Sequence, residues 1–305
     1  MEPHGNKHYA VGTDVGGSHV CSAVIDLRTG EMAGPVCEMP LDSKAGASVI
    51  LDVLSRSIAG AVEAAGASGM VAGAGLAFPG PFDYVHGVST VHGVGKYDRI
   101  YGLDLSSSLY SLLCGHGICS FRFVNDAAAF ALGECAAGAG AGVSRVVAVT
   151  LGTGVGSGFV EDGALVESGD RVPACGWVYH LPFGDGIADG EFSTRWICRR
   201  FFELTGRKVA GAKDVADECA AGSLQARMLF EEYGSRLADF ISPVLKRFGA
   251  DMLVLGGNIS RAYALFGPAL ENGMARNGCS VRVRTSALLD RAAMTGAASL
   301  FREGD

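Results

Sequence analysis

Two apolar runs near the N-terminus flank a short stretch that contains glycine. The first run covers residues 9–11 and the second covers residues 20–26, with small and polar residues between them. Apolar runs bounded by glycine predict two strands joined by a tight turn. The pattern then becomes helical, because apolar residues from Val49 to Val62 recur at the spacing of one helix face.

The same pattern gives the order of the remaining elements in the first half. It predicts a third strand at 31–40, a helix at 45–65, a buried strand at 70–78, a helix at 103–114 capped by Asp104 or Ser106, a strand at 120–124 and an alanine-rich helix at 127–137. A polar loop is expected between the strand at 70–78 and the helix at 103–114.

The second half begins in the same way and then gains helices. It predicts strands at 145–151, 157–161 and 164–166 around a glycine turn at 152–156, helices at 192–204, 213–220 and 224–247, a strand at 252–255, a helix at 260–273, a strand at 281–284 and a closing helix at 290–301. The order of the first half is therefore repeated, which indicates a duplicated unit with a glycine hairpin in each copy.

Composition and charge exclude several classes of protein. Apolar residues make up 49% of the chain and charged residues 19%, as in folded globular proteins. The net charge is −7 and lysine and arginine form no cluster, which argues against a nucleic-acid surface. Residues 1–8 hold no apolar segment and no run of about eighteen apolar residues occurs, so we expect neither a signal peptide nor a membrane helix. We expect a cytoplasmic protein.

Nine cysteines are scattered along the chain without a Cys-x-x-Cys pair. An odd number of cysteines in a chain of this size predicts free thiols in a reducing compartment. Cys114, His116 and Cys119 offer three ligands for a zinc ion, but no fourth ligand stands nearby in the sequence. A helix-to-strand loop with buried thiols is therefore the favoured interpretation of this segment.

The glycine turn between the first two strands has the residue types of a phosphate-binding site. Gly16 and Gly17 can adopt positive φ and carry no Cβ, so their N–H groups could lie against a phosphate. Asp14, at the end of the first strand, could hold Mg²⁺, usually through water. A plain hairpin with a glycine turn explains the same stretch if it is taken alone, because short glycine motifs are weak signals.

Five segments, in this order, resemble the ROK family of bacterial sugar kinases and sugar-responsive repressors, within the superfamily of actin-like ATPases. They are Gly12 to Ser18, Pro79 to Asp83, Val124 to Ala127, Gly152 to Gly156 and Leu255 to Ser260. The resemblance covers essentially the whole chain. It implies an α/β fold of two actin-like ATPase (RNase H-like) domains of βββαβαβα type, with a nucleotide and sugar cleft between them. We expect the domains at 1–127 and 128–305, with the final helix at 290–302 packing back on the N-terminal domain.

The resemblance also implies the residues of the acceptor site. Asp126 matches the family's catalytic Asp and would accept the proton of the sugar hydroxyl, which is a poor nucleophile. The alternative is that Asp126 caps the following helix, since Asp is a favoured cap. Asn125 would hydrogen-bond neighbouring hydroxyls, and Gly80 lies in the loop that resembles the family's sugar-side loop. Lys96 and Asp98, in the same loop, could reach a substrate, although solvated loop residues are the favoured interpretation.

The expected nucleotide ligands come from three of the five segments. They are Asp14, with Mg²⁺ held through water, then Gly16, Gly17, Ser18, Thr153, Gly154 and Gly156 at the phosphates, and Gly256, Gly257 and Asn258 at the adenosine. A strand-to-helix turn would also account for Gly256 and Gly257.

The region that is most characteristic of the family departs from its pattern. The segment Gly176 to His180 keeps the Gly and the His of the family motif but has Trp177 in place of its first Glu, and farther on only Glu191 remains. The zinc-binding cysteines are absent, so we expect no zinc. His180 and Glu191 are candidate sugar ligands, against a buried structural His and an exposed Glu at a helix start. Trp177 could stack on a sugar, shape a pocket or fill core.

The resemblance therefore implies an ATP-dependent sugar kinase that uses Mg²⁺ and phosphorylates a hexose or an N-acetylhexosamine, at the 6-hydroxyl, with Asp126 as base. The alternative is a regulatory or degenerate protein that binds sugar and nucleotide without turnover. A repressor would need a helix-turn-helix segment before the first strand, for which we expect no room before Tyr9. The family resemblance also implies a homodimer, with a small-molecule sugar and ATP as partners, no nucleic acid and no membrane.

Overall fold

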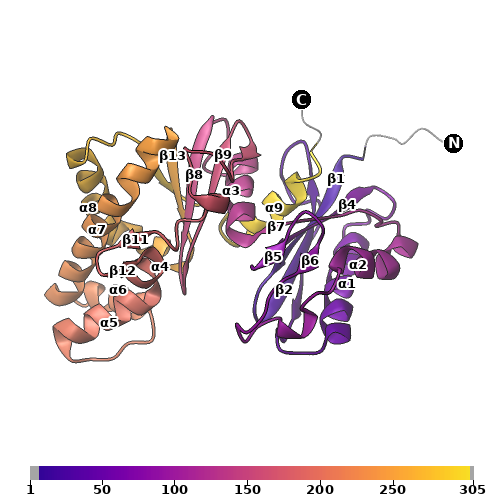
Figure 1. Ribbon diagram of the computed structural model, residues 1–305, viewed down its shortest axis with the longest axis horizontal. Coiled ribbons are helices and arrows are strands. Elements are labelled where there is room, and N and C mark those ends of the chain that lie inside the picture. The colour runs from indigo at the N-terminus through magenta and orange to yellow at the C-terminus, as the bar shows by residue number, and fades with distance from the viewer. Residues whose placement is uncertain (1–6, 303–305) are drawn as a thin grey trace. The chain divides into compact units, whose positions relative to one another are not determined.

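The computed structural model describes residues 7–302, and these residues form two compact units. The first unit contains residues 7–138 together with 290–302, and the second contains residues 139–289 (Figure 1). Each unit is built around a five-stranded sheet, and each is described here by itself.

The first sheet has the order β3-β2-β1-β4-β7. Its strands are β1 (Tyr9–Val15), β2 (His19–Asp26), β3 (Cys37–Pro40), β4 (Val71–Phe78) and β7 (Phe121–Asn125). The first three strands pair antiparallel, and β1, β4 and β7 run parallel. The parallel strands carry long apolar runs because both faces of the sheet are covered by helices.

Helices α1 (Ala47–Ala64) and α2 (Leu105–Leu113) pack on one side of this sheet. The predicted cap Asp104 is confirmed for α2, because its side chain accepts a hydrogen bond from Ser107 N at 2.9 Å. Helices α3 (Asp126–Ala137) and α9 (Ala292–Ser299) pack against each other, and α9 also packs against β1 and β4. Both α3 and the C-terminal α9 lie in the first unit.

Four glycines let α9 approach its neighbours at backbone distance. Gly12 on β1 and Gly75 on β4 are register partners, and a Cβ on either would come within 1.9 Å of a carbonyl oxygen of α9. A Cβ on Gly133 of α3 would lie 2.0 Å from a carbonyl oxygen of α9, and one on Gly296 of α9 would lie 1.8 Å from a carbonyl oxygen of α3. The close contact of helix with sheet and of helix with helix therefore depends on the absence of these side chains.

The second sheet has the order β10-β9-β8-β13-β14, which is the same arrangement of antiparallel and parallel strands as in the first unit. Its strands are β8 (Arg145–Leu151), β9 (Val155–Glu161), β10 (Ala164–Leu165), β13 (Met252–Gly256) and β14 (Arg282–Thr285). The repeated order confirms the predicted α/β fold class with a duplicated unit.

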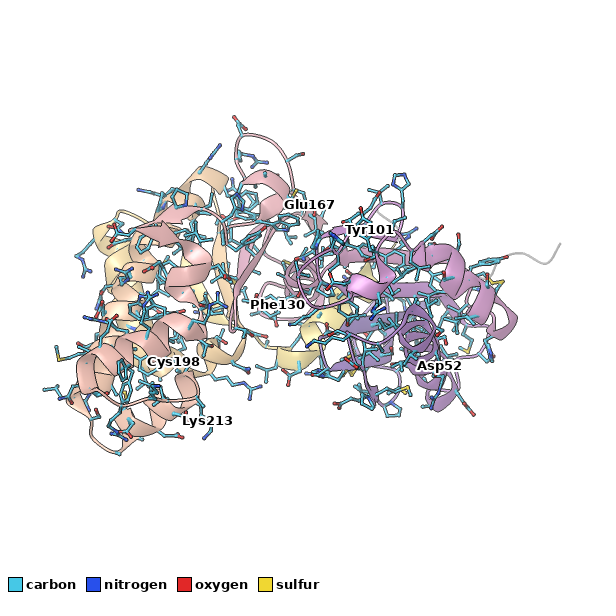
Figure 2. The ribbon with its side chains drawn as sticks, turned by 60° about the horizontal axis from the view of Figure 1, so that its bottom comes forward. Asp52, Tyr101, Phe130, Glu167, Cys198 and Lys213 are labelled. Atoms are coloured by element: carbon cyan, nitrogen blue, oxygen red, sulfur yellow. A yellow bond between two sulfur atoms is a disulfide. The ribbon has the colours of Figure 1, made fainter. Side chains whose placement is uncertain are left out.

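Helices of the second unit share one apolar core with its sheet. They are α4 (Ala188–Phe192), α5 (Thr194–Thr205), α6 (Ala212–Ala220), α7 (Leu224–Phe248) and α8 (Tyr263–Arg276). In Figure 2, Cys198 on α5 and Lys213 at the start of α6 mark two neighbouring helices of this layer. The core joins Phe159 of β9 to Phe248 of α7 through an edge-on ring contact with centroids 5.2 Å apart.

Short elements occupy connections between the main strands and helices, and three of them overlap the ends of helices predicted from the sequence. They are β5 (Phe82–Asp83), β6 (Val88–Ser89), β11 (Pro182–Phe183), β12 (Gly186–Ile187) and 3-10 turns at Asp98–Ile100, Cys114–His116, Ala174–Gly176, Asn258–Ala262 and Leu289–Arg291. No helix among residues 7–302 is long and apolar enough to cross a membrane.

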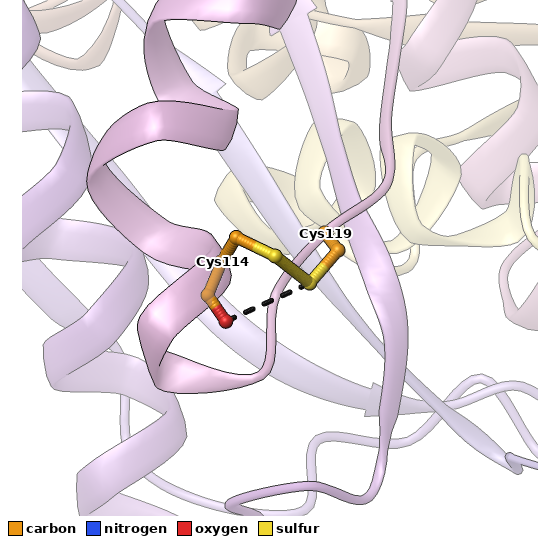
Figure 3. Close-up of a disulfide and its surroundings, with 2 residues drawn as sticks. All are labelled: Cys114 and Cys119. Carbon is orange, nitrogen blue, oxygen red and sulfur yellow. Dashed lines mark hydrogen bonds between the residues drawn. A yellow bond between two sulfur atoms is a disulfide. The ribbon is translucent and has the colours of Figure 1, made fainter.

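Two expectations for the first unit were wrong. The third strand covers four residues rather than 31–40, because Pro35 cannot donate to the ladder and a Cβ on Gly34 would lie 2.7 Å from that of Ala65. Cys114 and Cys119 are neither buried nor free thiols. They form a disulfide between the end of α2 and the start of β7 (Figure 3), since the tight turn after α2 brings their Cα atoms within 4.6 Å.

Candidate active site

The turn between β1 and β2 directs its carbonyl groups toward the protein. The carbonyl oxygen of Gly16 accepts a hydrogen bond from the Tyr97 hydroxyl, and that of Ser18 accepts one from Leu41 N at 2.9 Å. Within residues 7–302, the N–H groups of Gly17 and Ser18 have no hydrogen-bond partner, and both residues are exposed. Neighbouring unpaired N–H groups at a turn form a concave site for an anion.

Space, rather than an unusual backbone conformation, explains the glycines of this turn. Neither Gly16 nor Gly17 has a positive φ, so the conformational reason given from the sequence does not apply. A Cβ on Gly16 would lie 3.1 Å from the carbonyl oxygen of His19, and one on Gly17 would lie 3.3 Å from Lys96 Nζ. A side chain on either residue would crowd the turn.

Two carboxylates of the first unit, Asp14 and Asp126, both have raised pKa values. Asp14 is half-buried at the end of β1, and burial followed by the charge of Asp126 raises its pKa to about 6. His19 acts in the opposite direction and lowers that pKa. The pKa of Asp126 is also raised, mainly because the surrounding protein disfavours the charged form, although the residue itself remains exposed to solvent. Both groups therefore have more basic character than surface carboxylates.

Asn125, not Asp126, is the cap of α3. The Asn125 Oδ1 accepts hydrogen bonds from Ala127 N at 3.1 Å and from Ala128 N at 3.4 Å. Its Nδ2 donates to the Tyr84 hydroxyl at 3.3 Å, and the amide also hydrogen-bonds the Asp126 carboxylate. Asp126 is the first residue of the helix, and its Oδ1 accepts from Ala127 N at 2.9 Å, which orients the carboxylate. The capping alternative for Asp126 is therefore not needed to explain the start of α3.

The two carboxylates are chemically suited to a divalent cation. Among residues 7–302, no three or more His, Cys, Asp or Glu side chains gather as a metal site. Mg²⁺ does not require such a group, because it keeps several water ligands and is commonly held by one or two carboxylates together with substrate phosphates. A cation beside Asp14 would also relieve the repulsion from Asp126 that contributes to its raised pKa.

The glycine turn of the second unit is organised like that of the first. Its carbonyl groups are tied to α5, because Gly152 O accepts from Thr194 N at 2.7 Å and Thr153 O accepts from an Arg195 guanidinium N–H at 3.0 Å. Within the described chain, the N–H groups of Thr153 and Gly154 have no hydrogen-bond partner. Both units thus present unpaired backbone donors where their first two strands meet.

Asp189, on α4, supports the second glycine turn. Its Oδ1 accepts a hydrogen bond from Val155 N at 2.9 Å, and its Oδ2 pairs with Arg195 at 2.5 Å. A Cβ on Gly154 would lie 2.8 Å from the same Oδ1, so the turn and the carboxylate require a glycine there. The sequence analysis missed Asp189 and Arg195, because nothing in the local pattern connects α4 with a turn more than thirty residues earlier.

The segment that contains Trp177 and His180 is fixed by Ser157. The buried Ser157 hydroxyl donates to Gly176 O at 2.6 Å and accepts from Val178 N at 3.0 Å. Val178 is buried, Trp177 is half-buried and His180 is exposed. A buried structural role for His180 is therefore wrong.

Glu191 is engaged by two arginines of the second unit. Its carboxylate pairs with Arg236 of α7 and lies 3.5 Å from Arg199 of α5. The side chain is 16% exposed, so the expected alternative of an exposed Glu at a helix start is wrong. Its position as a sugar ligand stays a prediction, and the two arginines hold the carboxylate in place.

Backbone geometry accounts for one of the glycines predicted at the adenosine. Gly257 has a φ of +78°, and a Cβ there would meet Leu151 O at 2.4 Å. Gly256 ends β13 and is buried, whereas Gly257 and Asn258 are exposed. A glycine at 257 is thus required by the fold whether or not a nucleotide binds there.

Gly80 is exposed in the loop after β4, and a Cβ on it would lie 3.1 Å from the Tyr84 hydroxyl. The same hydroxyl donates to Phe78 O at 3.0 Å and receives the Asn125 amide. Tyr84 therefore joins the Gly80 loop to the end of β7. It escaped the sequence analysis because an isolated aromatic residue in a polar loop carries no pattern.

Comparison with known proteins gives a consistent set of relatives. The model of the ROK family matches residues 10–181. The chain is 32% identical to a glucokinase from Thermotoga maritima over 205 residues, which cover 59% of this chain and 65% of that protein, just under two thirds of its length. It is 25% identical over 270 residues to a polyphosphate glucokinase from Mycobacterium tuberculosis, covering 87% of this chain and 83% of that protein.

A solved structure has the same fold. The ROK family glucokinase from Streptomyces griseus, in complex with glucose and AMPPNP, superposes with a TM-score of 0.73 at 21% identity. The superposition covers 97% of this chain and 100% of that chain.

Proposed function

This chain belongs to the ROK family, and from that premise we propose that it is an ATP-dependent carbohydrate kinase. The proposed acceptor is a hexose or an N-acetylhexosamine, phosphorylated at its 6-hydroxyl, with Asp126 as the general base. The kinase names of the similar proteins support the reaction class, and the AMPPNP in one related structure supports ATP as donor.

The observation that carries this proposal is the state of Asp126. A general base needs a carboxylate that is open to the substrate and more basic than usual. Asp126 meets both conditions, because it is exposed at the N-terminus of α3 and its pKa is raised. The hydrogen bond from Ala127 N orients one oxygen, and the other oxygen can accept the hydroxyl proton. Asp126 can take this role with α3 in the conformation described above.

The acceptor would be positioned by groups that already have a fixed orientation. The Asn125 amide, held against Tyr84, would hydrogen-bond a hydroxyl next to the reacting one, and the Gly80 loop would lie beside it. In the second unit, the exposed His180 would supply a further hydrogen bond, and Glu191 would act as an acceptor held in place by its two arginines. Trp177 is the residue most suited to select among sugars.

The donor would be held by backbone N–H groups. Gly17 and Ser18 in the first unit, and Thr153 and Gly154 in the second, have unpaired donors that can bind phosphate oxygens. Mg²⁺, held by Asp14 through water, would neutralise charge on the phosphate oxygens during transfer. Asp14 would thereby hold the cation at the end of β1.

A coupled assay of ADP release with Mg·ATP tests the proposal. Glucose, mannose, fructose, N-acetylglucosamine and N-acetylmannosamine are compared as acceptors, with wild-type protein and with Asp126→Asn. The matched control is Asp52→Asn, an exposed carboxylate on α1 labelled in Figure 2. We expect turnover on one sugar, lost by a factor of about 10² to 10⁴ in Asp126→Asn and retained in the control.

Turnover that survives in Asp126→Asn, or ADP release that needs no sugar, would refute the proposed mechanism. Binding of sugar and nucleotide without turnover on any acceptor would instead favour the regulatory or degenerate alternative.

A further inference from the structure

We propose that Lys96 binds a phosphate group of the donor at the first glycine turn. This inference deepens the proposed function, on which its kinetic consequence rests. It assigns a charged ligand to a turn whose other donors are backbone N–H groups.

The position of the Lys96 side chain is the first observation. A Cβ on Gly17 would lie 3.3 Å from Lys96 Nζ, 3.6 Å from Cε and 3.7 Å from Cδ. The end of the lysine side chain therefore lies over the face of Gly17 that has no side chain. Gly17 and Ser18 carry the unpaired N–H groups of this turn, so the ammonium group stands beside the backbone donors that would receive a phosphate.

The loop that carries Lys96 is anchored on both sides of it. Tyr97 is buried, its N–H donates to Ser43 O at 2.7 Å and its hydroxyl donates to Gly16 O. Burial raises the pKa of Tyr97, which keeps the hydroxyl protonated as a donor. On the other side, the Asp98 carboxylate accepts from Gly95 N at 2.9 Å. The backbone at Lys96 is thus tied directly to the glycine turn.

The charge of Lys96 is available. Within residues 7–302 the ammonium group forms no ion pair and no hydrogen bond, and the residue is exposed. An ammonium group is a suitable ligand for phosphate as a point charge.

Direct binding measurements test the inference without requiring turnover. Calorimetric titrations with magnesium tripolyphosphate and with adenosine are compared for wild-type protein, Lys96→Met and Lys96→Arg. The matched control is Lys208→Met, which removes an exposed lysine without an ion pair from the segment between α5 and α6. The circular dichroism spectrum of each variant establishes that it is folded.

We expect Lys96→Met to weaken tripolyphosphate binding by about tenfold, because a charge-assisted contact is lost, and to leave adenosine binding unchanged. Lys96→Arg should retain most of the affinity, and the difference between wild type and Lys96→Met should shrink as salt rises. In the kinase assay, Lys96→Met should raise the KM for ATP and leave the KM for the sugar unchanged.

Unchanged tripolyphosphate binding in Lys96→Met would overturn the inference. An equal loss for adenosine, the same loss in Lys208→Met, or no binding of tripolyphosphate by the wild-type protein would do the same. If the selective loss is observed but no sugar is phosphorylated, the phosphate site stands and the proposed kinase function fails.

Discussion

Replacing Gly75 with alanine should strongly destabilise the first unit, because the new methyl group would collide with the backbone of α9. Gly75 lies in the middle of β4, is buried and has no role in the proposed site. Its Cβ would come within 1.9 Å of the carbonyl oxygen of Ala297. Cβ atoms essentially never lie closer than 3.0 Å to a non-bonded atom, so α9 would have to withdraw by at least 1.1 Å (3.0 minus 1.9).

The cost follows from what α9 contacts. The helix packs on β1 and β4 through Met294 and Ala298, which are buried, and it touches α3 on its other side. Overpacking of a core costs about 1–3 kcal/mol, and a gap of 0.5–1 Å forfeits about a quarter to a half of each dispersion contact. Because the obstacle is backbone rather than a flexible side chain, we expect a loss of about 3 kcal/mol or more.

Thermal unfolding followed by circular dichroism measures this loss. For a unit of this size, 3 kcal/mol corresponds to a decrease in Tm of about 6–12 °C. Gly115→Ala is the control, because a Cβ there has nothing within 4 Å and the residue does not have a positive φ. The control should change the free energy of unfolding by less than about 0.5 kcal/mol. A Gly75→Ala protein with the wild-type Tm would refute the close approach of α9.

Three further predictions concern Asp14, the disulfide and Asp189. Burial raises the pKa of Asp14 from its ordinary value of 3.8 to about 6 in the folded protein, so the free energy of unfolding falls as pH rises from about 4 to 6. In urea titrations, Asp14→Asn should be about 1–2 kcal/mol more stable than wild type at pH 7 and should have no advantage at pH 4. The double variant Cys114→Ser, Cys119→Ser should lose about 2 kcal/mol in the free energy of unfolding, because the unfolded chain is no longer constrained by a short closed loop. Adding a reductant to wild-type protein should lower its Tm to that of the double variant. A wild-type Tm that does not respond to the reductant would contradict the disulfide. Asp189→Ala removes the acceptor of the Val155 N–H in the second glycine turn and should weaken ATP binding about tenfold in calorimetry. The control Asp185→Ala, at an exposed carboxylate, should bind ATP as wild type does. Equal affinities of the two variants for ATP would contradict a supporting role of Asp189.

Most of the elements could be predicted from the sequence because they depend on near neighbours. The apolar period placed α1 within two residues of its observed bounds, and β8 ended where Gly152 interrupts an apolar run. The Asn-Asp pair at 125 and 126 could be placed at the end of a strand for the same reason. The prediction failed at 31–40, where proline and a crowded glycine shorten the strand.

The details of the site depended on contacts between distant residues. Lys96 reaches Gly17 because Tyr97 bonds to Gly16, which lies 81 positions earlier in the chain. Glu191 is paired with Arg236 across 45 positions. A period or a motif describes residues a few positions apart, so neither contact leaves a local signal.

The sequence by itself determined the duplicated order of strands and helices, the two glycine turns and the position of Asp126 at the start of a helix. Only the tertiary structure decided that α9 approaches the backbone of the first sheet at Gly12 and Gly75, that Cys114 and Cys119 pair, and which cations stand beside the turns. The physical reason is the separation along the sequence over which each interaction acts. Backbone propensity and hydrophobic period act between neighbours, whereas close packing and charge pairing depend on which distant residues the fold brings into contact.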